Sequence, residues 1–258
     1  MQRKNKLKEL DRKIRVGAVS YLNTKPLIYG FEQGLMKDQI ALIFDYPANI
    51  AAALLNDTID IGLVPVAVIP EMTEYHIIGN HCISSEGEVA SVCLFSEVPL
   101  QEIETVLLDY QSRTSVKLAE ILLKEYWKID PVIKAADHDF RSEIKGKTAA
   151  VVIGDRALEQ RKISTYRYDL GLAWKKYTGL PFVFAAWVSN KELPAEFIEA
   201  FDSANVLGLD NIEKVIAQNP YDTYDLATYY ADNIKFKLGD DKRKSISLFL
   251  DKLNVNNF

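Results

Sequence analysis

The sequence is poor in the residues that bind metal ions or form disulfides. Its 258 residues include two cysteines and three histidines. Cys82 and Cys93 lie in strand-like apolar runs, which favours buried thiols in a reducing compartment over the alternative, a disulfide. His76, His81 and His138 form no set of ligands at metal-binding spacing. The sequence therefore predicts no metal site.

Long apolar runs and an excess of positive charge are also lacking. No segment approaches the roughly 18 uncharged apolar residues of a membrane span. Residues 1–13 are rich in Lys and Arg but lack the apolar run of a signal peptide. We therefore expect a cytoplasmic protein without a membrane partner. The net charge of −5 and the pI near 5.4 argue against a nucleic-acid partner.

The chain is long enough for one large domain or two small ones, and 48% of its residues are apolar. Its first third alternates strand-like and helix-like patterns in the order β-α-β-α-β, at residues 14–19, 26–33, 40–45, 47–55 and 59–64. This order predicts a parallel sheet with right-handed crossovers. Ligands of such sheets bind at the carboxyl ends of the strands.

Two further extended runs suggest how the chain is divided. Residues 89–95 and 181–188 read as strands that leave the first domain and return to it. We therefore expect lobe I to comprise residues 1–95 and 189–258, with the C-terminal helices packed on it, and lobe II to comprise residues 96–188. The predicted fold class is α/β, with two mixed or parallel sheets in a two-lobed clamp around a cleft.

The segment Ser20-Tyr21-Leu22-Asn23-Thr24 separates the first strand from the first helix. Such a helix entrance leaves backbone N–H groups unpaired and carries a positive partial charge, which suits a carboxylate. On these residues alone, a simple helix cap by Asn23 or Thr24 is an equal alternative.

A second hydroxyl-rich turn, Ser112-Arg113-Thr114-Ser115, opens a helix predicted over residues 116–127. Its hydroxyls and backbone N–H groups would bind an anion, and Arg113 would pair with a carboxylate. A capped helix with a solvent-facing arginine is the alternative. Asp155, at the end of a predicted strand, would contact a ligand hydroxyl or cap the following helix.

These segments match the motifs of a known family. V-G-A-V-S-Y-L-N-T-K-P-L, L-L-D-Y-Q-S-R-T-S and the strand end I-G-D-x-A resemble motifs of the chorismate dehydratase family of the futalosine route to menaquinone. The longest match is Y-D-L-G-x-x-W-x-x-x-T-G-x-P-F-V-F-A-x-W, over residues 168–187. Arg156 brings a large charged side chain to the x position of the third motif. The resemblance spans most of residues 16–187.

The resemblance implies a periplasmic-binding-protein-like fold used as an enzyme. The implied reaction is a hydro-lyase step, the dehydration of chorismate to 3-[(1-carboxyvinyl)oxy]benzoate in menaquinone biosynthesis, without a cofactor. Because chorismate carries two carboxylates, the two hydroxyl-rich turns would provide one anion site in each lobe. The predicted substrate-binding residues are Ser20, Tyr21, Thr24, Ser84, Ser85, Ser112, Arg113, Thr114 and Ser115.

The predicted catalytic residues are Asn23 and Asp155. The base stays open between a side chain, with Asp155 and Glu86 as candidates, and a substrate carboxylate positioned by Asn23. Alternative functions are a solute receptor without chemistry and the related 1,4-dihydroxy-6-naphthoate synthase, for which a histidine in the cleft motif would be expected. A monomer or a homodimer fits equally well.

Overall fold

The structure is a computed structural model that describes residues 12–136 and 139–256. Residues 1–11 and His138, on which part of the localisation and metal predictions rests, lie outside the described residues. The chain divides into two compact units. Unit 1 comprises Met1–Cys82 and Ala185–Pro220, and unit 2 comprises Ile83–Phe184 and Tyr221–Phe258.

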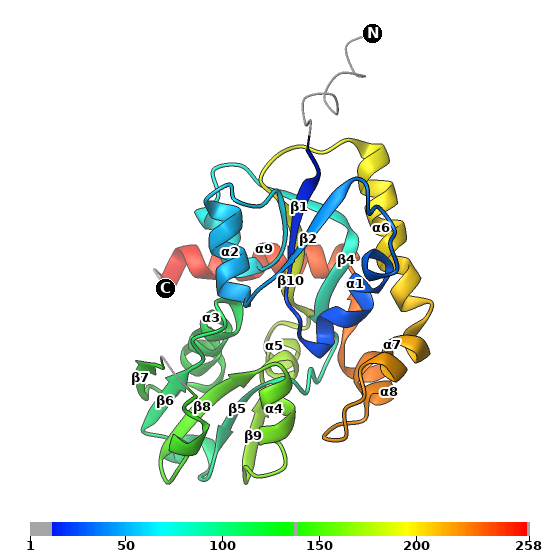
Figure 1. The fold of residues 1–258 in the computed structure, drawn as a ribbon. Helices are drawn as coiled ribbons and strands as arrows, with labels where there is room; N and C mark the ends of the chain where they lie inside the picture. Colours follow the sequence, from blue (N-terminus) through cyan, green and yellow to red (C-terminus); the bar gives the residue numbers. More distant parts are fainter. Residues whose placement is uncertain (1–11, 137–138, 257–258) are drawn as a thin grey trace. The chain divides into compact units, whose positions relative to one another are not determined.

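A six-stranded sheet contains the strands of unit 1 (Figure 1), in the order β11-β4-β10-β3-β1-β2. Its strands are β1 (Ile14–Ala18), β2 (Ile40–Phe44), β3 (Ile61–Pro65), β4 (His76–Ser85), β10 (Phe182–Ser189) and β11 (Lys235–Lys237). β1 pairs in parallel with both β2 and β3, as the β-α-β-α-β pattern predicts, while β10 is antiparallel to β3. β1, β2 and β3 therefore end at one edge of the sheet.

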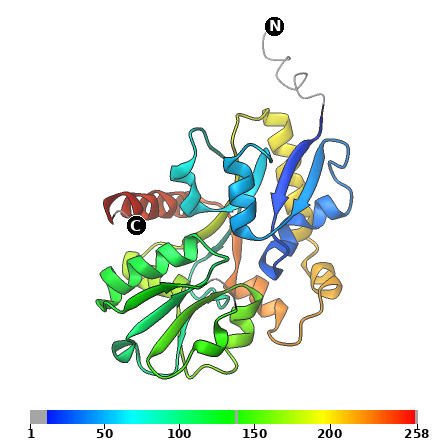
Figure 2. The same cartoon turned by 60° about the vertical axis from the view of Figure 1, so that its left-hand side comes forward.

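The helices of unit 1 follow the apolar patterns of the sequence. They are α1 (Lys25–Glu32), α2 (Pro47–Leu55), α6 (Ala195–Leu209) and α7 (Ile212–Gln218). α1 and α6 lie side by side in Figures 1 and 2 and cross at very short range. A Cβ on Gly30 would lie 2.1 Å from the Ala204 carbonyl oxygen, and one on Gly208 would lie 1.9 Å from that of Pro26. The two glycines therefore permit the crossing.

We expect Gly208→Ala to destabilise the protein by about 1–3 kcal/mol, because α1 and α6 must separate to admit the methyl group. The gain in helix propensity, about 1 kcal/mol, does not compensate for this loss. Urea unfolding measures the effect. Gly239→Ala is the control, since a Cβ there meets nothing within 4 Å. Equal midpoints for the two variants would contradict the close crossing.

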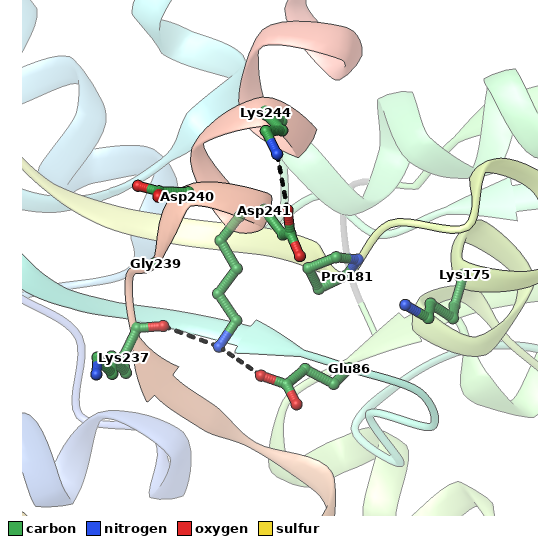
Figure 3. Close-up of a pocket in the computed structure, with 9 residues that line it drawn as sticks. Glu86, Lys175, Pro181, Lys237, Gly239, Asp240, Asp241 and Lys244 are labelled. Carbon is green, nitrogen blue, oxygen red and sulfur yellow. Dashed lines mark hydrogen bonds and ion pairs between the residues drawn. The ribbon is translucent and has the colours of Figure 1, made fainter.

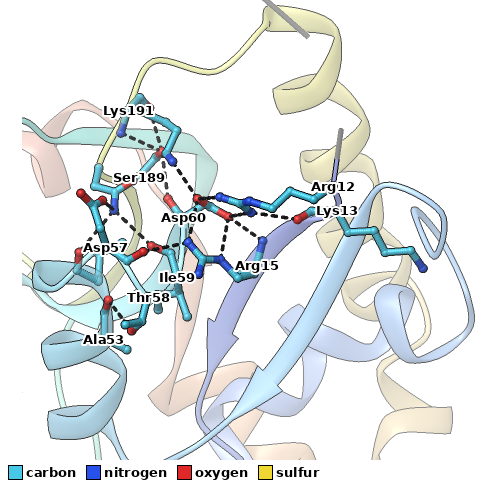
Figure 4. Close-up of polar contacts among 12 residues, drawn as sticks. Arg12, Lys13, Arg15, Ala53, Asp57, Thr58, Ile59, Asp60, Ser189 and Lys191 are labelled. Carbon is cyan, nitrogen blue, oxygen red and sulfur yellow. Dashed lines mark hydrogen bonds and ion pairs between the residues drawn. The ribbon is translucent and has the colours of Figure 1, made fainter. Parts of the chain in front are cut away.

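Opposite the carboxyl ends of the strands, unit 1 buries the carboxylate of Asp60 among three cations (Figure 4). Asp60 accepts hydrogen bonds from Arg12 at 2.6 and 2.8 Å, from the Arg15 backbone at 2.8 Å and from Lys191 at 2.7 Å. Burial tends to raise the pKa of Asp60, but these donors together hold it well below its usual value. The cluster joins the beginnings of β1 and β3 to the end of β10.

Unit 2 contains a five-stranded sheet in the order β7-β6-β8-β5-β9. Its strands are β5 (Val92–Ser96), β6 (Thr105–Leu108), β7 (Val132–Ala135), β8 (Thr148–Ile153) and β9 (Tyr166–Asp169). Its helices are α3 (Thr114–Ile121), α4 (Asp155–Gln160), α5 (Leu170–Thr178), α8 (Leu226–Thr228) and α9 (Asp240–Asn256). π-helical segments, Leu122–Trp127 and Tyr229–Asn233, continue α3 and α8. β6 is parallel to β8, so both strands end at the same edge.

Two aspects of the chain division differ from the sequence-based prediction. The strands that pass between units are β4 and β10, while residues 92–96 form β5 inside unit 2, paired with β8 and β9. The last helix was expected on lobe I, but α9 belongs to unit 2. There the indole of Trp174 donates a hydrogen bond to Ser245 at 3.0 Å, and its ring contacts Phe249. These contacts pair residues some 70 positions apart, which local patterns do not reveal.

Candidate functional site

The first candidate segment is a 3-10 turn, Leu22–Thr24, between β1 and α1. Ser20 is exposed, Tyr21 and Asn23 are half-buried, and Thr24 is fully buried. The turn follows the carboxyl end of β1, which pairs in parallel with β2 and β3, and ligands of parallel strands bind at this end.

Hydrogen bonding in this turn does not support the simple-cap alternative. Thr24 is the N-cap residue of α1, but its side chain makes no capping hydrogen bond. Instead its hydroxyl donates to the side-chain oxygen of Asn23 at 3.2 Å. Within the described residues, the Asn23 amide nitrogen has no hydrogen-bond partner. This side chain thus offers an oriented donor beside a helix entrance.

The entrance of α2 already holds a carboxylate of the protein itself. After β2, the Asp45 carboxylate accepts hydrogen bonds from the backbone of Tyr46 at 2.7 Å and from the Asn49 amide at 2.9 Å. A carboxylate at the entrance of α2 would repel a second anion. Of these two entrances, α1 is therefore the better anion site.

In unit 2, the turn before α3 shows the cap that was predicted as an alternative. The Ser112 hydroxyl oxygen accepts a hydrogen bond from the Ser115 backbone at 3.1 Å. Thr114 and Ser115 are buried, while Ser112 and Arg113 are half-buried. Ser112 therefore stabilises the helix, and the other backbone donors of the first turn define the candidate anion site.

Because this cap satisfies a backbone donor, we expect Ser112→Ala to lower the free energy of unfolding by about 1 kcal/mol. Ser203→Ala serves as the control, since the Ser203 hydroxyl bonds a carbonyl inside α6 and caps no helix. Thermal or urea unfolding measures both variants. An unchanged midpoint for Ser112→Ala would rule out a stabilising cap.

Arg156, the departure noted in the third motif, pairs with an aspartate of the second motif. Its Nη2 lies 2.8 Å from both carboxylate oxygens of the buried Asp109 and 2.9 Å from the Gln111 side-chain oxygen. Burial raises the pKa of Asp109, and the charge of Arg156 opposes this. The pair links the turns that follow β6 and β8.

Asp155 is the first residue of α4, and it follows a glycine with a φ of +64°. The N-cap residue is Gly154, so Asp155 does not occupy the capping position of that helix. The Tyr221 hydroxyl donates to the Asp155 carbonyl at 3.1 Å. Burial of the Tyr229 and Tyr230 side chains raises their pKa, and the negative charge of Asp155 raises it further. These tyrosines lie in a segment without a recognised motif, so the sequence did not indicate them.

The predicted Ser84 and Ser85 lie at the end of β4. The Ser84 hydroxyl donates to the Lys235 carbonyl, so this hydroxyl makes a structural contact. The Ser85 hydroxyl is buried without a partner within the described residues. A Cβ on Gly171 would lie 2.3 Å from the Ser85 hydroxyl oxygen, so the D-L-G motif gives this serine its space.

The predicted site residues fall into two groups. Ser20, Tyr21, Asn23 and Thr24 lie in unit 1, and the others lie in unit 2. Within unit 2, Ser112–Ser115 and Asp155 follow neighbouring parallel strands, β6 and β8, and so share one sheet edge. The structure brings these residues together, while their contacts with substrate stay a prediction.

Unit 2 also contains a cavity of about 590 Å³ that the motifs do not indicate (Figure 3). It lies at the beginning of α9, and most of its lining is charged. The residues that line it are Glu86, Lys175, Pro181, Lys237, Gly239, Asp240, Asp241, Lys242 and Lys244. The buried Lys242 ammonium lies 2.8 Å from the Lys237 carbonyl and 3.1 Å from Glu86.

Across the described parts of the chain, no cluster of three or more His, Cys, Asp or Glu side chains is arranged to hold a metal ion. No helix in those parts is both long and apolar enough to cross a membrane. Cys82 and Cys93 are both buried free thiols, as the sequence predicts.

Comparison with known sequences decides the family. A model of the family described as menaquinone biosynthesis matches residues 14–254. The chain belongs to this menaquinone biosynthesis family. One curated relative, the chorismate dehydratase of Thermus thermophilus, is 24% identical over 267 residues, which cover 93% of this chain and 95% of the relative. The resemblance seen in the motifs is thereby confirmed.

Solved structures show which fold this member of the family has. A protein from Archaeoglobus fulgidus matches with a TM-score of 0.71 and 12% identity, covering 96% of this chain and 99% of the other. The periplasmic aliphatic sulphonate binding protein of Escherichia coli matches with a TM-score of 0.65 and 16% identity, covering 95% and 87%. A Candida albicans protein described as having the generic periplasmic binding protein fold matches with a TM-score of 0.59 and 13% identity, covering 95% of each chain. The predicted periplasmic-binding-protein-like fold is thus confirmed.

Proposed function

We propose that this member of the menaquinone biosynthesis family is a cytoplasmic chorismate dehydratase, a hydro-lyase of the futalosine route that needs no cofactor. The observation that carries the proposal is the near full-length match to a chorismate dehydratase. The arrangement of Asn23 and Thr24 adds to it, because this turn presents an oriented amide donor at a helix entrance.

The substrate chemistry suits two separate anion sites. Chorismate carries two carboxylates, and each unit has one candidate helix entrance, at α1 and at α3. Backbone N–H groups at such entrances favour a carboxylate, and hydroxyl groups add donors. Each entrance is thus suited to a substrate carboxylate.

The reaction removes a ring proton and the hydroxyl group on the neighbouring ring carbon. The C–H and C–O bonds break, a second bond forms between the two carbons, and the ring becomes aromatic as water leaves. Aromatisation drives the step, so the protein mainly has to orient the substrate and assist proton transfer. Asp155 is one candidate base. The other is a substrate carboxylate oriented by Asn23.

A receptor without chemistry is the main alternative, because relatives of this fold include solute-binding proteins. The sister enzyme, 1,4-dihydroxy-6-naphthoate synthase, would be expected to carry a histidine in its cleft motif. His81 is the buried histidine of the described residues, and its Nδ1 lies 2.8 Å from Asp202 of α6. Its position on β4, outside the motifs, favours a structural role.

Mixing the protein with chorismate tests the proposal. We expect the absorbance of the ring diene to disappear and a product lighter by one water to appear in the mass spectrum. Binding with an unchanged spectrum would indicate a receptor. Turnover of cyclised futalosine instead of chorismate would indicate the sister enzyme.

A further inference from the structure

The Asp169 carboxylate holds a loop that is distant in sequence. Asp169 ends β9 and is about nine-tenths buried. It accepts hydrogen bonds from the backbone of Val89 at 3.1 Å, Ala90 at 2.8 Å and Leu172 at 3.0 Å. Two of these donors belong to the 86–91 loop, which connects β4 to β5. One carboxylate thus joins this loop to the first turn of α5.

The held loop has an unfavourable backbone conformation. Ala90 is fully buried and has a φ of +61°, a region that residues with a Cβ rarely occupy. Such a conformation persists only when its surroundings impose it. The two loop N–H groups that donate to Asp169 belong to Ala90 itself and to Val89, the residue before it. The Asp169 carboxylate therefore holds the backbone at Ala90, the residue with the unfavourable conformation.

Ser91, the next residue, passes this constraint to the turn that contains Asp155. Its carbonyl accepts a hydrogen bond from the Gly154 backbone at 2.8 Å, and its hydroxyl accepts one from Tyr229 at 2.7 Å. Gly154 has a φ of +64° and a ψ of −148°, a conformation open essentially to glycine alone. The hydrogen bond to Ser91 thus fixes the turn that leads directly into Asp155.

Two ion pairs hold the remainder of the loop. Glu88 pairs with Arg161 at 2.5 Å, and Glu86 pairs with the buried Lys242 at 3.1 Å. The second pair is visible at the cavity in Figure 3. Arg161 also donates to the Ala90 carbonyl at 3.3 Å. Asp169, by contrast, binds the N–H groups of Val89 and Ala90, so the carboxylate and Arg161 hold the central part of the loop together.

We propose that Asp169 is a positioning residue that fixes Asp155 through Ala90, Ser91 and Gly154. The inference rests on the proposed function, because Asp155 is one of the groups proposed there to act on the substrate. Asp169 itself touches no substrate. Its carboxylate sets the place of the Gly154–Asp155 turn, and the Tyr229 hydroxyl holds Ser91 from the other side.

The test replaces Asp169 by Asn, which keeps the volume but turns an amide NH₂ toward backbone donors. We expect kcat for chorismate to fall about 10- to 100-fold, because a small displacement of a reacting group has an effect of this order. KM should change less than about threefold, since the proposed anion sites are elsewhere.

Two controls separate positioning from a general loss of stability. Asp60→Asn removes a buried carboxylate of unit 1 and should leave kcat unchanged well below its unfolding temperature. The double variant Asp155→Ala/Asp169→Asn should be no less active than Asp155→Ala alone, because Asp169 acts through Asp155. Equal kcat losses in Asp60→Asn and Asp169→Asn, or additive losses in the double variant, would overturn the inference.

A second measurement does not depend on activity. In ¹H–¹⁵N spectra, Asp169→Asn and Tyr229→Phe should both shift the Gly154 amide resonance and speed its exchange with solvent, while Asp60→Asn should not. If wild-type protein left chorismate unchanged, the proposed function would fail, and this spectrum would still test the link from Asp169 to Gly154. An unmoved Gly154 resonance in Asp169→Asn would refute the link even in an active enzyme.

Discussion

Asn23→Ala should lower kcat/KM for chorismate by about 10²–10³, the usual effect of removing one preorganised donor from an active site. Asn23 combines two features: its oxygen accepts the Thr24 hydroxyl, and its amide nitrogen has no partner within the described residues. The variant should fold normally, because Asn23 is half-buried and makes no capping bond.

A matched asparagine and a milder variant sharpen this test. Asn219 follows α7, and its side chain donates to the Val215 carbonyl of that helix, so Asn219→Ala should keep wild-type activity. Thr24→Val removes only the hydroxyl that orients Asn23 and should have a smaller effect, about tenfold. Undiminished turnover in Asn23→Ala would remove Asn23 from the mechanism.

Asp60→Asn should have the largest effect on stability, a loss of about 3 kcal/mol at neutral pH, because it leaves Arg12, Arg15 and Lys191 around a neutral group. The carboxylate is fully buried and accepts charged donors at 2.6–2.8 Å. Urea unfolding gives the difference. Asp241→Asn is the control, since that ion pair with Lys244 is well exposed and contributes little.

The stability that the Asp60 carboxylate provides should depend on pH. The folded protein holds the pKa of Asp60 well below its usual value, whereas the unfolded value is about 3.9. The stabilisation is therefore complete above the unfolded pKa and is lost as pH falls toward the folded pKa. The stability difference between wild type and Asp60→Asn should be constant near neutrality and should shrink below about pH 4. A difference that persists unchanged at pH 3 would contradict the charge argument.

Local patterns in the sequence were sufficient for the elements that position both helix entrances. The helix predicted over residues 26–33 differs from α1 by one residue at each end, and the one predicted over residues 47–55 is α2. The helix predicted over residues 116–127 is α3 with its π-helical continuation, which begin two residues earlier. The strand predicted over residues 40–45 differs from β2 by one residue. These segments have strong apolar periodicity and begin or end at proline or at polar residues, so local rules suffice.

The parts of the structure that local patterns did not predict are formed by contacts between residues far apart in the sequence. The pairing of Asp109 with Arg156 joins two motifs that read separately as independent turns. The β9 strand, Tyr166–Asp169, has four residues, and the sequence patterns assigned no strand to it. The tyrosines around Asp155 come from a C-terminal segment that belongs to unit 2, and no local signal indicates such an assignment.

The most direct test of the account is a ¹H NMR spectrum of chorismate after incubation with catalytic amounts of the protein. The account predicts that the ring signals of the diene are replaced by aromatic signals while the vinyl protons of the enolpyruvyl group remain in equal proportion. An unchanged spectrum, or aromatic signals accompanied by free pyruvate, would contradict it.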